Sequence, residues 1–292
     1  MYSAIKKSIS IIIDNPILTL SFVIYLIFLT LLMPKIFISQ NIIVFILTVI
    51  LTLLLTSAFF AGWLQMVKSA ISNSKKEQRD DEERIKEFLS IKSDFFAAVP
   101  VYILPLLAGI ILYLIMFSLL VAFNIKFANH FIGNLDFLIE KLNSIPKDSQ
   151  GLQAFFLGLP QEKILIIWYW QILFLFTIGL FNFFMMFWAS ALYYPEKCTT
   201  NPLSALKNSL LVIFKHPVKS FTLYLFILFL GFIFRTMGVF FSTNVVLYFI
   251  FMILAIYFWV FVFVLIFDYY ESRFYNHSDN WCDMLGKDKT GN

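Results

Sequence analysis

Charged residues are scarce in this sequence: only 14% of its 292 residues are Asp, Glu, Lys or Arg, whereas 60% are apolar. Soluble domains carry charge at about 25% of their positions. The mean hydropathy of +0.83 comes from several long apolar stretches, which a bilayer accommodates and a soluble core does not. This scarcity of charge excludes an ordinary soluble domain and indicates an integral membrane protein.

Residues that commonly carry chemistry are also few. The three histidines, His130, His216 and His277, have no second histidine or carboxylate at the spacing of a zinc site. Cys198 and Cys282 lack the paired spacing of metal-binding cysteines. The sequence has neither a glycine-rich phosphate loop with its lysine nor a serine flanked by glycines in a nucleophile elbow. We therefore expect no enzymatic activity, no cofactor and no metal.

What the sequence does contain is a series of long apolar segments. Each has the roughly 20 residues that an α-helix needs to cross a hydrocarbon layer of about 30 Å. Helices are required because lipid offers no hydrogen-bond partner to an unpaired backbone group. We predict an all-α membrane protein with six transmembrane helices, at residues 16–34, 42–67, 98–123, 164–194, 218–240 and 245–267.

Small residues and prolines inside these spans bear on how they pack. Ala58 and Gly62 form a small-xxx-small pair that would let the second span approach a neighbour closely. In the third span, Pro100 lies near the start, where a missing N–H costs little. Pro105 is expected to bend the first turns of that span.

Lysine and arginine are distributed unevenly among the segments that connect the spans. With the N-terminus in the cytoplasm, sixteen of the 22 basic residues fall in cytoplasmic segments and six fall outside. Cytoplasmic loops of membrane proteins carry such an excess of Lys and Arg. We therefore expect a multi-pass protein of the cell membrane with both termini in the cytoplasm.

A segment at the start of the chain is repeated near its end. In residues 2–16 and 203–217, the apolar positions trace one face of a helix and a proline precedes a span. We predict an amphipathic helix on the cytoplasmic surface, with its apolar face in the acyl boundary and its lysines at the headgroups. The matching residues are Ala4 and Ala205, Lys6 and Lys207, Ser8 and Ser209, and Pro16 and Pro217.

A weaker third copy precedes the third span. Ile85, Phe88, Phe95 and Phe96 fit the same helical face, but Lys92 occupies a position where an apolar residue belongs. The predicted architecture is therefore three repeats, each an amphipathic surface helix followed by two spans. A single membrane domain is expected over residues 1–274, with repeats at about 1–68, 84–195 and 202–274, and with 275–292 as a flexible cytoplasmic tail.

The largest predicted outside segment, residues 124–163, has an amphipathic pattern of its own. One interpretation is a helix packed on the outer bilayer surface, and the other is a lid or lipid-contacting cap. The apolar positions of its helical face are Phe127, Phe131, Leu135, Leu138 and Leu142.

Six polar residues in the spans, at their ends or in the repeated helix are candidate site residues. Asn182 lies near the middle of the fourth span, where it would either bond a neighbouring helix or contact a substrate. Arg235 lies within the fifth span, and a charge there is by default a functional candidate unless it reaches the outer surface. Asp268 and Glu271 end the sixth span as an interfacial ion cluster or a site, and Lys6 and Lys207 are the interfacial lysines of the repeated helix.

The repeated Lys-x-Ser with a following proline, together with the ends of spans two, four and six, resembles a broad group of poorly characterised six-span bacterial inner-membrane proteins. The chain is similar as well to the membrane domain fused to some glycerophosphodiester phosphodiesterases. The resemblance covers nearly the whole chain and implies six spans in an inner membrane. No soluble phosphodiesterase domain is present, so that activity does not carry over. The span ends are Phe60-Ala61-Gly62-Trp63, Trp188-Ala189-Ser190-Ala191 and Asp268-Tyr269-Tyr270-Glu271.

We expect a non-enzymatic protein that supports membrane, envelope or lipid organisation. The alternative is a transporter or channel for a small or lipid-like substrate, in which the repeats provide the moving halves, although midspan glycine–proline interruptions are missing. A polar cavity reaching Asn182 and Arg235 would favour transport, whereas lateral lipid-filled grooves would oppose it. Expected partners are membrane lipids, and further proteins or a second copy of the chain. Nucleic acid is not expected, because no basic groove with interleaved aromatics is evident.

Overall fold

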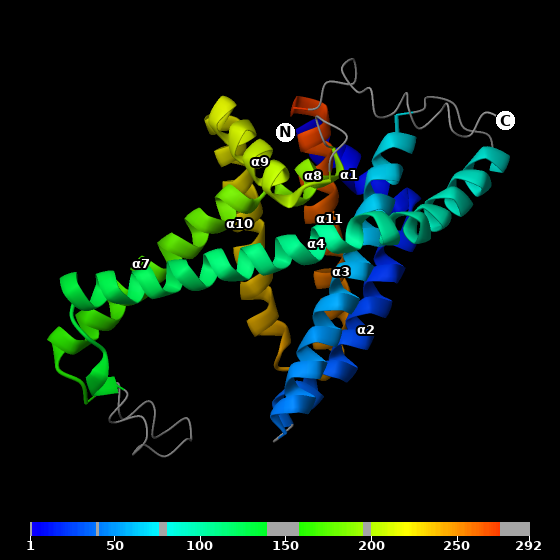
Figure 1. Ribbon diagram of the computed structural model, residues 1–292. Coiled ribbons are helices and arrows are strands. Elements are labelled where there is room, and N and C mark those ends of the chain that lie inside the picture. The colour runs from blue at the N-terminus through cyan, green and yellow to red at the C-terminus, as the bar shows by residue number, and fades with distance from the viewer. Residues whose placement is uncertain (1, 39–40, 76–80, 139–157, 195–199, 275–292) are drawn as a thin grey trace. The chain divides into compact units, whose positions relative to one another are not determined.

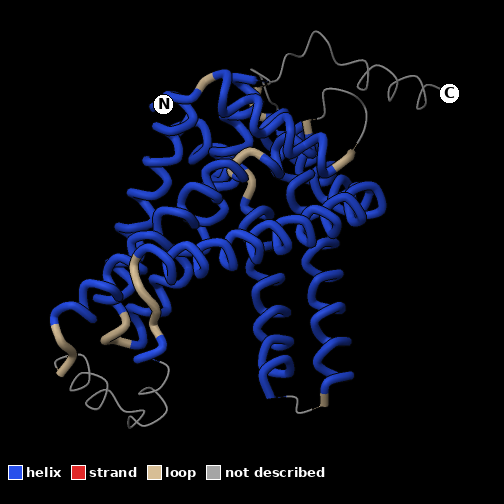
Figure 2. Tube along the Cα trace, turned by 60° about the vertical axis from the view of Figure 1, so that its left-hand side comes forward, coloured by secondary structure: helices blue, strands red, loops and turns tan. Residues whose placement is uncertain are grey.

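A computed structural model describes residues 2–38, 41–75, 81–138, 158–194 and 200–274, and within these ranges every regular element is a helix (Figure 1, Figure 2). The predicted all-α class is therefore confirmed. The predicted tail, 275–292, lies outside the described residues, as do Cys198 and Cys282. The helices are α1 (Tyr2–Asp14), α2 (Pro16–Ile38), α3 (Ile42–Asn73), α4 (Asp81–Phe131), α7 (Gln161–Met185), α8 (Trp188–Tyr193), α9 (Pro202–Lys215), α10 (Pro217–Phe241) and α11 (Val245–Phe274).

Several of these helices are long and apolar enough to cross a membrane. Five meet this criterion: α3, the part of α4 from Leu89, α7 continued through α8, α10, and α11 as far as Ser272. A sixth is obtained if α1 and α2, which meet at a bend of 74°, form one span. The chain is therefore built as a multi-pass membrane protein.

The break between α1 and α2 has a local cause in the sequence. Pro16 has no N–H to donate, and its ring would clash with the carbonyl four residues earlier if α1 continued. Asn15 ends α1 by donating to the Ile11 carbonyl, from its backbone N at 3.0 Å and from its side-chain Nδ2 at 2.8 Å. The same break recurs where α9 ends at Lys215 and Pro217 begins α10. A short amphipathic helix separated by a proline break from a long apolar helix therefore occurs in both predicted places.

The middle part of the chain differs from the prediction. Three separate segments were predicted here: a surface helix, a span at 98–123 and the start of an outer amphipathic helix. The structure has one continuous helix of 51 residues, α4, in their place. At 1.5 Å per residue its length measured along the helix is about 77 Å, more than twice the thickness of the hydrocarbon layer. The helix continues through Pro100 and Pro105, and it ends at Phe131 before a turn at Gly133. The rest of the predicted outer helix, from residue 139, lies outside the described ranges.

The described chain divides into two compact units. Unit 1 comprises Met1–Ile110 with Phe184–Asn292, and unit 2 comprises Ile111–Phe183. In unit 2 the second half of α4 pairs with α7, and polar contacts join them. The Trp170 indole donates to the Gly133 carbonyl at 2.8 Å, and the Thr177 hydroxyl donates to Asn124 Oδ1 at 3.1 Å.

The core of unit 1 is centred on Trp63 of α3, whose side chain is fully buried. Its indole Nε1 donates to the Leu18 carbonyl of α2 at 2.9 Å. The ring centroid lies 5.2 Å from that of Phe22 and 5.2 Å from that of Phe263. Trp63 thus joins α2, α3 and α11 near the end of unit 1 where α1 lies, which we call the α1 end.

The first and last parts of the chain bury matching positions. In α1 and α9 the equivalent serines are fully buried, and an equivalent isoleucine is buried one turn later. The correspondence continues beyond the proline into α2 and α10. These observations are consistent with the predicted repeat of α1–α2–α3 as α9–α10–α11. The buried pairs are Ser8 and Ser209, Ile12 and Ile213, Thr19 and Ser220, and Phe22 and Leu223.

Candidate functional site

Unit 1 contains a groove of about 940 Å³ between α2, α3 and the first half of α4. Pockets that hold small molecules are commonly about 300–1,000 Å³ in volume. Along α2 the groove extends from Ile17, at the α1 end, to Leu32. Three of its lining residues, Leu20, Phe28 and Phe96, are each more than half exposed, so the groove is accessible from the side of the unit.

The groove lining is almost entirely apolar, and most of its polar groups already have partners in the protein. The Tyr25 and Thr56 hydroxyls share a hydrogen bond of 3.0 Å. The Thr52 hydroxyl donates to the Thr48 carbonyl at 2.8 Å. An occupant therefore meets hydrocarbon and satisfied hydroxyls over most of the surface. The non-apolar lining residues are Ser21, Tyr25, Thr52, Thr56 and Lys92.

Aromatic rings form one wall of the groove. Tyr25 and Phe59 stack with their centroids 4.2 Å apart and their planes at 8°, and Phe95 lies 6.3 Å from Phe59. The Phe95 ring rests directly on Gly62, where a Cβ atom would lie only 2.5 Å from Phe95 Cδ2. The close approach predicted from the small-xxx-small pair is thus confirmed at Gly62. Because Gly62 has no side chain, α4 lies close enough to α3 for Phe95 to form part of the groove wall.

The charged residue of the lining is Lys92, which is exposed on α4. Nearby on α4, the Asp94 carboxylate accepts a hydrogen bond of 2.6 Å from the Ser69 hydroxyl. The ion pairs found among the described residues involve Lys7 and Lys75, not Lys92. The lysine that interrupts the apolar face of the predicted middle repeat therefore provides a positive charge beside an apolar groove.

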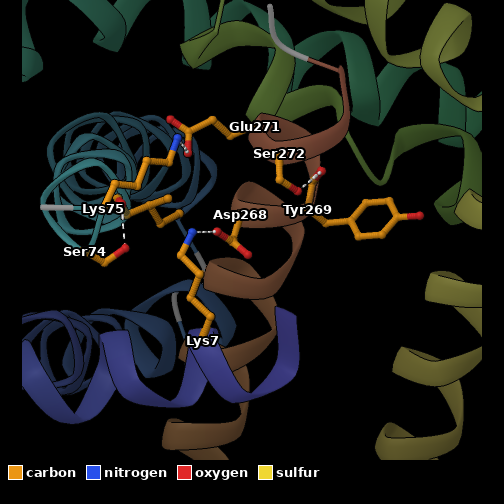
Figure 3. Close-up of polar contacts among 8 residues, drawn as sticks. Lys7, Ser74, Lys75, Asp268, Tyr269, Glu271 and Ser272 are labelled. Atoms are coloured by element: carbon orange, nitrogen blue, oxygen red, sulfur yellow. Dashed lines mark hydrogen bonds and ion pairs between the residues drawn. The ribbon is translucent and has the colours of Figure 1, made fainter. Parts of the chain in front are cut away.

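Apart from the groove, a cluster of charged side chains lies at the α1 end, around the last turns of α11 (Figure 3). Lys7 of α1 forms an ion pair with Asp268, and Lys75, just after α3, places Nζ 2.8 Å from Glu271 Oε2. Both carboxylate side chains are 3% exposed, against 34% for Lys7 and 40% for Lys75. Residues three apart lie on one helical face, so α11 offers both carboxylates to neighbouring elements.

The predicted interfacial residues are therefore only partly brought together. Asp268 and Glu271 are in the ion-pair cluster, but the lysine that reaches Asp268 is Lys7. Lys6 is exposed on α1, and Lys207 is exposed on α9. The lysines that pair with Asp268 and Glu271 were not identified from the sequence. The only sequence feature that indicated such lysines was the presence of basic residues beside the apolar face of α1.

The predicted intramembrane residues lie in different units. In unit 2, Asn182 accepts a hydrogen bond of 3.2 Å from the Tyr113 hydroxyl, a contact between α7 and α4. This is the helix-bonding role considered for it. In unit 1, Arg235 of α10 has an exposed side chain. Neither residue lines the groove.

The segments singled out at the ends of spans two, four and six pack together in unit 1. Helix α8 contacts both α3 and α11, and α11 contacts α3. The buried Tyr193 hydroxyl donates to the Ala61 carbonyl at 2.8 Å, and Lys68 Nζ donates to the Tyr193 carbonyl at 2.9 Å. The Phe187 and Tyr269 rings stack with their centroids 6.2 Å apart. These residues build the core that supports the ion-pair cluster.

Within the described ranges, no group of three or more His, Cys, Asp or Glu side chains is arranged to hold a metal ion. Comparison with protein-family models, curated proteins and solved structures found no match to the chain. The groove and its lysine are therefore the features of the described chain that bear on function.

Proposed function

We propose that this chain is a six-span protein of a bacterial inner membrane that binds membrane lipid and contributes to lipid organisation without catalysing a reaction. The observation that carries the proposal is the groove between α2, α3 and α4, with its nearly unbroken apolar lining. In this proposal the α1 end faces the cytoplasm, as the distribution of basic residues predicts.

The chemistry of the groove favours a lipid chain over a polar solute. A solute rich in hydroxyl or amide groups would leave those groups unpaired against the apolar wall, at a cost of about 1–3 kcal/mol each. The Tyr25, Thr52 and Thr56 hydroxyls already have partners, so they need none from an occupant. Acyl chains have no such requirement and reach a lateral opening directly from the bilayer.

Filling the groove tests this proposal. The full-length protein would be placed in phosphatidylcholine vesicles that contain a trace of lipid with a photoactivatable group on its acyl chain. After illumination, the protein would be digested and the labelled residues identified by mass spectrometry. We expect labelled residues on the groove side of α2. Ala58→Trp places a large ring in the lining and should remove most of this labelling.

Ala108→Trp is the matched control, because Ala108 is exposed on α4 and does not line the groove. The control protein should be labelled as the wild type is. Equal α2 labelling of the Ala58→Trp protein and the control, with both proteins folded by circular dichroism, would contradict lipid binding in the groove.

A further inference from the structure

We propose that the lipid held in this groove is an anionic phospholipid, whose headgroup pairs with Lys92 while an acyl chain lies along α2 toward Leu32. This inference rests on the proposed function and names the class of its ligand. The headgroup class follows from the position of Lys92, and the path of the acyl chain follows from the length of the apolar lining along α2.

The positive charge of Lys92 lies at one end of the groove. Asp94, two residues after Lys92, accepts a hydrogen bond from Ser69 in the part of α3 near the α1 end, and Lys92 lines the same groove as Ile17 and Met66 of that end. Leu29 and Leu32 line it further along α2. The groove thus has a positively charged end and an apolar remainder, and this is the polarity of a phospholipid with its headgroup at the α1 end.

The carboxylates described near Lys92 are bound to other groups. At the α1 end, the Asp268 and Glu271 carboxylates are paired with Lys7 and Lys75. Asp94, two residues from Lys92, is held by the Ser69 hydroxyl. Among the side chains described for unit 1, no carboxylate forms an ion pair with Lys92, so its charge is available to an anion from outside the chain. A phosphate-bearing headgroup of net negative charge meets this requirement, whereas a zwitterionic headgroup brings a cation of its own.

The groove is long enough for an acyl chain. From Ile17 to Leu32 the lining of α2 spans about 22 Å at 1.5 Å per residue. One leaflet of a bilayer contributes about 15 Å of hydrocarbon, half of the full 30 Å layer. An acyl chain whose headgroup lies at Lys92 can therefore stay within the groove through its whole leaflet.

Two photoactivatable probes test the headgroup preference. The full-length protein in phosphatidylcholine vesicles would receive equal amounts of phosphatidylglycerol or phosphatidylcholine probe, with the same reactive acyl chain. We expect the anionic probe to label the groove about fivefold more than the zwitterionic probe, the scale of one lysine at an anionic membrane surface. Lys92→Gln should bring the ratio near one, and Lys92→Arg should retain the preference.

Lys86→Gln removes the same charge from an exposed position on the same helix that does not line the groove, and it should leave the ratio unchanged. Equal labelling by the two probes in the wild-type protein, with both signals lost in Ala58→Trp, would overturn the anionic preference and leave lipid binding intact. Labelling that Ala58→Trp does not reduce would overturn both. Competition by millimolar inorganic phosphate would identify a free-anion site in place of a lipid headgroup site and would likewise overturn the inference.

Discussion

Lys7 of α1 and Asp268 of α11 form an ion pair across 261 positions of sequence. One turn further along α11, Glu271 holds Lys75 in the same way, so α11 binds both α1 and the segment that follows α3. Breaking a buried ion pair is costly because one charge is left without compensation. The cluster therefore stabilises the arrangement of the first and last helices, and with it the scaffold on which the groove is built.

Removing the Asp268 charge should destabilise unit 1. Because Lys7 is about one third exposed, at 34%, water recovers part of its charge in Asp268→Asn, and we expect a loss of about 1–2 kcal/mol. The measurement is chemical unfolding in detergent, followed by tryptophan fluorescence. Lys7→Met should have a similar effect, and the double variant should cost less than the sum of the two single variants. Lys6→Met, at an exposed neighbouring position, is the control, and an equal effect from Lys6 and Lys7 would contradict the assignment.

Gly62→Ala should destabilise the protein and alter the groove. The new methyl group would lie within 2.7 Å of three atoms of the Phe95 ring, so the ring has to move. Overpacking of this kind costs about 1–3 kcal/mol. The measurement is thermal unfolding in detergent, together with lipid labelling of α2.

Gly231→Ala should not destabilise the protein, because nothing lies within 4 Å of a Cβ atom at that position of α10. There the substitution should stabilise the helix by up to about 1 kcal/mol. Phe95→Leu combined with Gly62→Ala should recover part of the stability lost by Gly62→Ala alone. Similar shifts for the two glycine variants would contradict the packing of Phe95 on Gly62.

Trp63→Phe should cost about 1–3 kcal/mol, because the buried Leu18 carbonyl loses the indole donor while much of the apolar contact is kept. The readout is the midpoint of thermal unfolding by circular dichroism. Trp259→Phe is the matched control, since Trp259 is 54% exposed on α11 and its loss should have little effect. If the two variants unfold at the same temperature, the assigned role of the Trp63 hydrogen bond is wrong.

The predicted orientation can be checked by thiol labelling of intact bacterial cells expressing a variant without Cys198 and Cys282. A cysteine at Thr243, in the exposed turn between α10 and α11, should react with a membrane-impermeant maleimide added from outside. A cysteine at Ser10 on α1 should react only after the cells are permeabilised. The reverse pattern would overturn the cytoplasmic placement of the termini.

Features that depend on neighbouring residues in sequence were predictable. The starts of α3 at Ile42, α10 at Pro217 and α11 at Val245 follow from apolar runs and proline positions, and each lies within one residue of its predicted span. The full length of α4 was not predicted, because Pro100 was expected to lie in the first turn of a separate span. The predicted third span already included both prolines, but nothing local in the sequence shows that the residues before Pro100 and those after 123 belong to the same helix.

Features that depend on tertiary packing were predicted less well. The residues that line the groove come from 17–32, 52–66 and 92–100. Whether these three segments lie side by side depends on how α2, α3 and α4 pack. Its one sequence signal was Lys92, the residue that broke an otherwise apolar face. Choosing between Lys6 and Lys7 required the rotation of α1 about its axis, because successive helical residues point about 100° apart. The hydrophobic pattern defines that rotation too coarsely to distinguish them.

The pairing of Lys7 with Asp268 also has a consequence for biogenesis. A ribosome adds residues from the N-terminus onward, so Lys7 emerges long before the residue that holds it, 261 positions later. Until α11 has been synthesised and inserted, α1 has only the lipid surface and the helices beside it as neighbours. The ion pair can form only in the last stage of synthesis, and a chain truncated before Asp268 would leave its first helix without this attachment.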